Sequence, residues 1–187
     1  FIFVTGRNKT AIEDHFDHSF ELEETLFAKG KAAALETVRG MIHEPGTVAY
    51  VRQQEPAGLG HAVWCARHLI HDEPVAVLLA DDLILGSSCL AEMVASYQGG
   101  NMVAVMDVPK SETGSYGIIT PGADDGQLVE VSGLVEKPDP ANAPSNIGVV
   151  GRYIIEPGVF AQLGTQDRGT GNEVQLTDAL ARQIGKV

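Results

Sequence analysis

Short β-rich runs alternate with helical patterns through the first hundred residues, and this alternation limits the chain to few folds. Expected strands cover residues 1–4, 47–53, 75–80 and 102–108, and expected helices cover 10–16, 22–42, 60–70 and 89–98. Strands that alternate with helices indicate crossover connections and a parallel sheet covered on both faces. The run "VAVLLA" favours a central strand, because it is apolar at every position rather than at every second one.

The second half adds strands of a different kind. Two β-rich runs flank "GADDG", where the pair Asp125 and Gly126 favours a hairpin turn, and "NIGVVGRYIIE" predicts another strand. A closing helix is expected in "VQLTDALARQIG", whose apolar residues are Val174, Leu176, Ala179, Leu180 and Ile184. The pattern predicts an α/β fold with antiparallel additions.

Length and charge narrow the classes of function. With 187 residues, 44% hydrophobic and 20% charged, the chain suits one folded domain. A net charge of −12 disfavours nonspecific binding to nucleic acid or to an anionic membrane, and no apolar run approaches the roughly 20 residues of a membrane span. The two cysteines, Cys65 and Cys89, form no CxxC motif and favour a reducing cytoplasm.

Three candidate groups, "EPAGLG", "ADD" and "VEKP", lie at the ends of expected strands, where α/β proteins usually bind ligands. In "EPAGLG", Gly58 and Gly60 would let the backbone approach a flat ligand, although a plain tight turn explains them about as well. Asp81 and Asp82 follow the apolar strand and could hold a hard cation such as Mg²⁺. Asp178 on the closing helix could complete a two-carboxylate site, although alone it suits a solvated helix face.

Other polar groups are open to two interpretations. Glu136 and Lys137 end a strand before Pro138, so a lysine there could neutralise a phosphate and a glutamate could accept sugar hydroxyls. An exposed salt bridge of little energetic value is the alternative. Cys65, His68 and His71 have helical spacing but neither CxxC nor HxxxH, which favours a solvated face over a metal site; the sequence contains no P-loop or nucleophile elbow.

Six segments together resemble the bacterial UTP–glucose-1-phosphate uridylyltransferases, a family of sugar-phosphate nucleotidylyltransferases. They are "TGRNKTAIEDHFDHSFELE", "VRQQEPAGLGHAV", "LLADDLIL", "SYGII", "VEKPDPANAPSNIGVVGRYI" and "GNEVQLTDAL", in family order over nearly the whole chain. The resemblance implies a Rossmann-like, mixed but mostly parallel sheet flanked by helices, with an antiparallel β addition.

The resemblance also implies roles for matching residues. Gln53 and Gly58 would bind the uracil edge, Glu136 the glucose hydroxyls, Lys137 the sugar phosphate, and the backbone around Gly117 and Val149 the rest of the sugar. Asp81 and Asp178 would hold Mg²⁺ and, with Lys137, form the catalytic set. Asp82 receives no role, because many relatives have another residue at that position.

The implied reaction joins UTP and glucose 1-phosphate into UDP-glucose and pyrophosphate, in the cytoplasm and without nucleic acid or membrane partners. The family's "GxGTRxxPxTK" loop and its C-terminal segment, often used in oligomerisation, have no counterpart here. We therefore expect residues 1–187 to form one nucleotidyltransferase domain incomplete at both ends, inactive alone, from a protein that is a homo-oligomer at full length.

Two alternatives remain open at this point. One is a thymidylyltransferase or a relative that uses another base or sugar, although "GLGHAV" and the acidic region from Ser19 to Ile42 favour the uridylyl branch. The other is a sugar-nucleotide-binding domain without catalysis, against which both retained metal carboxylates argue.

Overall fold

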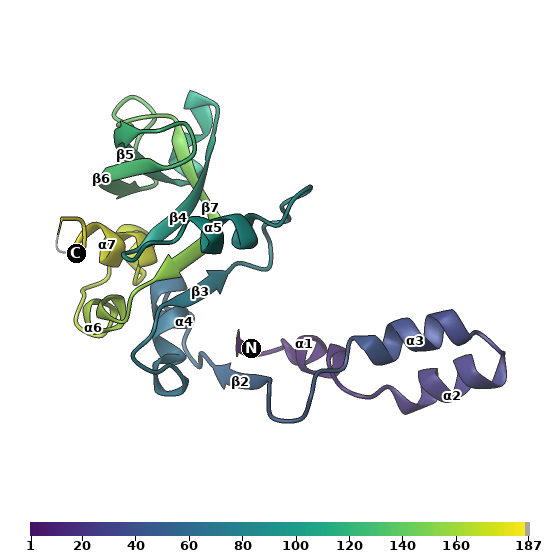
Figure 1. Ribbon diagram of the computed structural model, residues 1–187. Helices are drawn as coiled ribbons and strands as arrows, with labels where there is room; N and C mark the ends of the chain where they lie inside the picture. Colours follow the sequence, from purple (N-terminus) through teal and green to yellow (C-terminus); the bar gives the residue numbers. More distant parts are fainter. Residues whose placement is uncertain (186–187) are drawn as a thin grey trace. The chain divides into compact units, whose positions relative to one another are not determined.

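The computed structural model describes residues 1–185, which form two compact units (Figure 1). The first unit spans Phe1–Pro56 and the second begins at Ala57. The expectation of one nucleotidyltransferase domain stays a prediction.

The first unit consists of a two-stranded parallel sheet and three helices. Its elements are β1 (Ile2–Thr5), α1 (Thr10–His15), α2 (Phe20–Ala28), α3 (Ala32–Gly40) and β2 (Ala49–Arg52). Aromatic rings cover the short sheet, because Phe3 stacks on Phe16 and on Tyr50 with centroid distances of 4.9 and 5.6 Å. Both expected strands of this region and the helix after the first are confirmed.

The single long helix expected over residues 22–42 is wrong, because the chain turns back at Gly30. This glycine has φ +63°, and its N–H donates to Phe27 O while the N–H of Lys31 donates to Leu26 O. This pair of bonds is a Schellman motif, which ends helices at a left-handed residue. The region is therefore a hairpin of α2 and α3.

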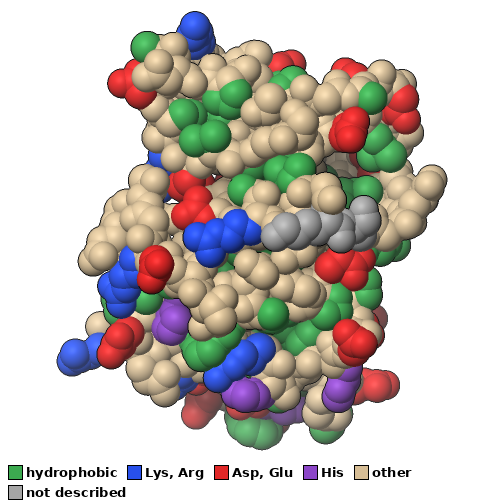
Figure 2. All heavy atoms as spheres, turned by 90° about the vertical axis from the view of Figure 1, so that its left-hand side faces the viewer, with side chains coloured by type: hydrophobic (Ala, Val, Ile, Leu, Met, Phe, Trp, Pro, Cys, Tyr) green, Lys and Arg blue, Asp and Glu red, His purple; other side chains and the backbone are tan. Residues whose placement is uncertain are grey.

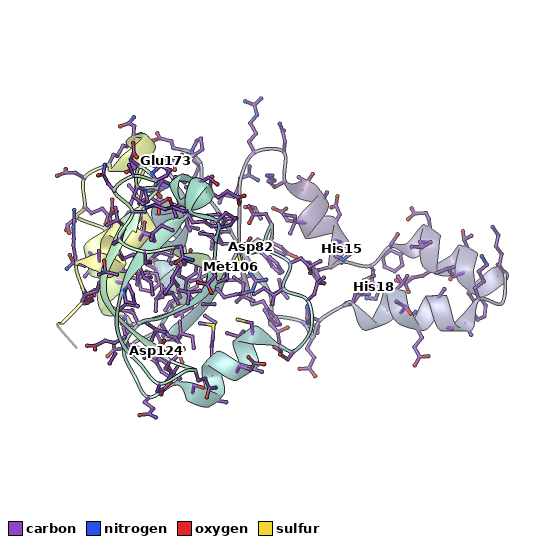
Figure 3. The ribbon with its side chains drawn as sticks, turned by 90° about the horizontal axis from the view of Figure 1, so that it is seen from above. His15, His18, Asp82, Met106, Asp124 and Glu173 are labelled. Atoms are coloured by element: carbon purple, nitrogen blue, oxygen red, sulfur yellow. The ribbon has the colours of Figure 1, made fainter. Side chains whose placement is uncertain are left out.

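A buried carboxylate ties the two helices of this hairpin together. Glu23 of α2 accepts hydrogen bonds from Arg39 Nε of α3 at 2.8 Å and from His18 Nδ1 at 3.0 Å. The hydrogen bond from Arg39 and then that from His18 lower the pKa of Glu23 below its ordinary value. Figure 3 labels His18, which directly precedes the N-cap residue of α2.

The second unit combines five strands with short helices. Its strands are β3 (Val75–Leu78), β4 (Met102–Asp107), β5 (Gly117–Asp124), β6 (Val129–Glu136) and β7 (Ile147–Ile155). Its helices are α4 (Leu59–Cys65), α5 (Cys89–Ser96), α6 (Gly158–Leu163) and α7 (Leu176–Ala181), with 3₁₀ turns at Arg67–Leu69, Lys110–Ser115 and Thr170–Asn172. Helix α6 was not predicted from the sequence. Helix α7 begins at Leu176, later than predicted, because Val174 lies before it and exchanges backbone bonds with Ala57 and Gly60.

The central strand of the five-stranded sheet is β7. It pairs antiparallel with β4, with β3 at its C-terminal half and with β5 at Gly148, while β5 and β6 form a hairpin. The mixed α/β fold is confirmed, but among the described strands the one parallel pair is β1 with β2. "Mostly parallel" is therefore wrong for the pairing: β3 and β4 share a direction, as expected, but a strand from later in the chain runs between them in the opposite direction.

The core of the second unit lies between this sheet and three helices. Ile155, Val159 and Leu176 are fully or almost fully buried, and α4, α6 and α7 pack against one another beside them (Figure 1). The visible face in Figure 2 shows hydrophobic side chains in separate groups between acidic and basic ones. Among the described residues, no helix has the length and apolar character to cross a membrane.

Candidate functional site

The glycines of the "EPAGLG" hinge are explained first by packing. Gly58 has φ +102°, and a Cβ atom there would lie 2.7 Å from Glu173 Cβ. A Cβ atom on Gly60 would lie 2.7 Å from Val174 O, which already accepts the Gly60 N–H at 2.8 Å. The segment before α7 therefore presses directly on the start of α4. Figure 3 labels Glu173 in this segment.

The loop after β3 separates its two aspartates. The Asp82 carboxylate turns back so closely over Gly151 of β7 that a side chain there would collide with it, and Figure 3 labels Asp82. Asp81 is exposed. The structure thus gives Asp82 a packing position, while Asp81 keeps an accessible carboxylate that could bind a cation.

Glu136, at the end of β6, belongs to a compact polar cluster. Its Oε2 accepts the Thr177 hydroxyl at 2.7 Å, and its Oε1 lies 3.8 Å from Lys137 Nζ. Gly117 faces Glu136 across the β5–β6 ladder, and a Cβ atom there would come within 2.8 Å of Thr177 Cγ2. Thr177 precedes Asp178 on α7, so this cluster joins the "VEKP", "SYGII" and "TDAL" segments.

Lys137 has an unusual backbone. Its φ is +45°, a left-handed conformation that costs a residue with a Cβ atom roughly 1–2 kcal/mol. Its N–H donates to Tyr116 O at 3.0 Å, and its side chain is about half exposed. Strain of this kind is concentrated at functional sites, where the surrounding structure holds it.

Tyr153 of β7 reports on the charges nearby. Burial, followed by the negative charges of Glu136, Asp82 and Asp81, raises the pKa of Tyr153 to about 12. The side chain is 4% exposed. After burial, carboxylates from the β6 end and from the loop after β3 both contribute to this raised pKa.

The other predicted residues take different positions. Asp178 lies in the first turn of α7, with its carboxylate against Gly169. Val149 is buried in the core on β7, so only its backbone could contact a ligand. Gln53 follows β2 in the first unit, where its N–H donates to Thr5 O at 2.8 Å. The predicted base-binding pair of Gln53 and Gly58 is thus divided between the two units.

The structure also reveals polar residues that the sequence analysis does not single out. Thr177 fixes the Glu136 carboxylate, and Arg152 binds the loop after β3 through backbone carbonyls. The residue type of a threonine or an arginine alone gives no signal of such contacts. Within residues 1–185, no group of three His, Cys, Asp or Glu side chains is placed to bind a metal ion. Cys65 Sγ lies 4.0 Å from His61 Nε2.

Comparisons with known proteins agree with this arrangement. The model of the nucleotidyl transferase family matches residues 9–186. A UTP–glucose-1-phosphate uridylyltransferase of Komagataeibacter xylinus is 47% identical over 190 residues, covering 100% of this chain and 67% of that protein. The chain belongs to the UTP–glucose-1-phosphate uridylyltransferase family.

Solved structures support the same family. A UDP-glucose pyrophosphorylase in complex with UDP-glucose has a TM-score of 0.86 and 38% identity, covering 100% of this chain and 69% of that one. A UTP-bound enzyme of this kind from Acinetobacter baumannii has a TM-score of 0.83 and 37% identity, covering 97% and 64%. The chain therefore spans about two thirds of the length of the relatives it matches.

Proposed function

We propose that the protein carrying this chain transfers uridylyl from UTP to α-D-glucose 1-phosphate, giving UDP-glucose and pyrophosphate. The proposal rests on one cluster at the end of β6, beside Gly117, in which Thr177 fixes the Glu136 carboxylate and Lys137 lies next to it. A carboxylate fixed on one oxygen keeps other lone pairs for sugar hydroxyls. The neighbouring ammonium suits the sugar phosphate.

The chemistry asks little of covalent catalysis. A phosphate oxygen of glucose 1-phosphate forms a bond to the α-phosphorus of UTP, and the bond to the departing pyrophosphate breaks. The nucleophile is already an anion, so positioning and charge neutralisation supply most of the rate. In this proposal Lys137 holds the phosphate of glucose 1-phosphate, and Glu136 orients the glucose ring.

A divalent cation, Mg²⁺ in our proposal, would be held by Asp81 and Asp178. The donor set fits, since both residues offer carboxylate oxygens, which hard cations prefer. Burial and then the charges of Glu136, Asp82 and Asp81 raise the pKa of Tyr153, which is consistent with negative charge near Asp81. When bound, the ion would neutralise phosphate charge and polarise the α-phosphate.

The setting completes the proposal. Cys65 and Cys89 are both free thiols, which supports a reducing cytoplasm. We also propose a homo-oligomer for the full-length protein, as the sequence resemblance implies. Neither nucleic acid nor membrane has a part in the reaction.

A displacement series tests the base and the metal together. Bound UDP-glucose is displaced with UTP, dTTP, GTP and CTP, with and without Mg²⁺. We expect UTP to be the strongest competitor. UTP should reach its full affinity only when Mg²⁺ is present. Asp81→Asn should remove the Mg²⁺ effect and leave displacement by uridine unchanged, because uridine carries no phosphate. A preference for dTTP would favour a thymidylyltransferase, and an Asp81→Asn variant with an intact Mg²⁺ effect would remove the metal role.

A further inference from the structure

Arg152 makes a set of contacts that the proposed reaction does not yet use. It lies on β7 opposite Leu78 of β3, and its Nη1 donates to Leu79 O at 2.9 Å and to Gly151 O at 2.8 Å. Its Nη2 donates to Asp82 O at 2.5 Å. One half-buried guanidinium therefore holds both ends of the 79–82 loop.

The backbone completes this attachment. Leu79 N–H donates to Gly151 O at 2.8 Å, so the first residue of the loop is still bonded to β7. At the other end, the Asp82 carboxylate lies against Gly151, where no Cβ atom would fit. Between these two fixed points, Asp81 is the exposed acidic residue.

We infer that Arg152 is a positioning residue that fixes the 79–82 loop so that Asp81 can bind the divalent cation. The inference rests on the proposed function, which gives Asp81 its metal role. A planar guanidinium donates to several carbonyls in a fixed geometry, whereas a lysine ammonium is a point charge on a flexible stem. Groups that orient a metal ligand typically change metal affinity by 10- to 100-fold when they are replaced.

The experiment measures Mn²⁺ binding to the chain by electron paramagnetic resonance, with saturating UDP-glucose. We expect Arg152→Lys to weaken Mn²⁺ binding by about 10-fold. Hydrogen exchange should become faster in peptides that cover residues 79–82. Affinity for UDP-glucose without metal should stay within about twofold, because Arg152 does not contact the Glu136 cluster in our assignment. Arg152→Gln introduces a planar donor without charge, and it should bind Mn²⁺ at least as weakly as Arg152→Lys. If Arg152→Lys does not fold, Arg152→Gln is compared with the unmodified chain instead.

Arg67→Lys is the matched control. Arg67 is also half-buried, donates through Nη1 to a backbone carbonyl, that of Trp64, at 3.1 Å, and lies in the same unit. It should bind Mn²⁺ as the unmodified chain does. Unchanged Mn²⁺ affinity in Arg152→Lys would overturn the inference and leave the metal proposal standing, provided that Asp81→Asn loses Mn²⁺. If Arg152→Lys lowers the affinity for Mn²⁺, the affinity for UDP-glucose and the thermal stability together, the inference would also be overturned, in favour of a general structural role. If the unmodified chain binds Mn²⁺ no better than Asp81→Asn does, both the metal role of Asp81 and the positioning role of Arg152 would be overturned.

Discussion

Lys137 combines a strained backbone with a proposed role in binding the sugar phosphate. Its φ of +45° disfavours any residue that has a Cβ atom, and its ammonium lies 3.8 Å from a carboxylate in a partly exposed pair that contributes little stability. Stability alone would therefore favour glycine here. The lysine is consistent with selection for the charge, which the proposed reaction uses on the sugar phosphate.

Lys137→Gly separates these two effects. We expect the free energy of unfolding to rise by about 0.5–1 kcal/mol, because glycine relieves the left-handed strain at some cost in backbone entropy. Affinity for UDP-glucose should fall, since the ammonium is lost. Chemical unfolding and calorimetry measure the two quantities.

Lys137→Ala is the control for this test, because it removes the same charge and keeps the strain. It should lose the same affinity without gaining stability. Equal stability of the glycine and alanine variants would show that the backbone at this position is not strained.

How far the sequence predicts the candidate site differs between Gly58, Asp81 and Glu136. Chemical type and place make Asp81 and Glu136 candidates, because Asp81 follows a strand and Glu136 ends one. The packing partners could not be predicted: the sequence does not show that Gly58 packs against Glu173 or that Thr177 donates a hydrogen bond to Glu136. These contacts join residues more than 40 positions apart.

Among the elements, the α2–α3 hairpin shows how one residue decides a helix boundary. The sequence over 22–42 is rich in helix-forming residues apart from Gly30 and Gly40, and the helix breaks at Gly30, whose φ is left-handed. A Cβ atom on Gly30 would meet nothing within 4 Å, so the effect of a substitution there is conformational.

A pair of glycine substitutions tests this boundary. Gly30→Ala should lower the free energy of unfolding by about 1 kcal/mol, because alanine resists the left-handed conformation. Gly40→Ala, the control within α3, should raise it by about 0.5 kcal/mol, since that position is helical and also open. Urea unfolding followed by circular dichroism measures both. A neutral Gly30→Ala would show that the turn does not depend on glycine.

The same hairpin should respond to acid through Glu23. Its pKa is lowered in the folded chain by Arg39 and His18, so its contribution to stability is present above the unfolded pKa of about 4.5 and is lost as the pH falls through the folded value. Glu23→Gln should lower the thermal midpoint at pH 7 and flatten its decrease below about pH 4.5.

Glu24→Gln serves as the control for the acid response, because Glu24 is an exposed neighbour on α2. It should leave the pH profile of the unmodified chain in place. Identical profiles for Glu23→Gln and the unmodified chain would contradict a stabilising role for the Arg39 and His18 contacts.

Sheet order was the element-scale feature that the sequence did not reveal. Alternating strands and helices indicate that β3 and β4 run in the same direction, which they do. Nothing in their composition shows that β7, more than 40 residues later, inserts between them and makes both pairings antiparallel. The hairpin of β5 and β6 was predictable, because Asp125 and Gly126 carry their own turn chemistry: Asp125 Oδ1 accepts the N–H groups of Gln127 and Leu128.

At the scale of the molecule, a chain of net charge −12 is proposed to bind anionic substrates. Local positive charge would offset this repulsion: Lys137 would neutralise the sugar phosphate, and a cation on Asp81 and Asp178 would neutralise the phosphates of UTP. Such a site should depend strongly on divalent cations, because long-range electrostatics oppose the approach of phosphates. The proposed substrates follow from family membership, and the residues proposed to hold the sugar follow from the geometry of the second unit.

The most direct test of the central claim is calorimetric titration of this chain with UDP-glucose and with UDP-mannose, each with and without Mg²⁺. The two sugars differ at one hydroxyl, and Glu136, fixed by Thr177, should distinguish them. We predict that UDP-glucose binds at least several-fold more tightly than UDP-mannose. Equal affinity for the two ligands, or no binding to a folded sample, would contradict the assignment of the Glu136 cluster as the sugar site.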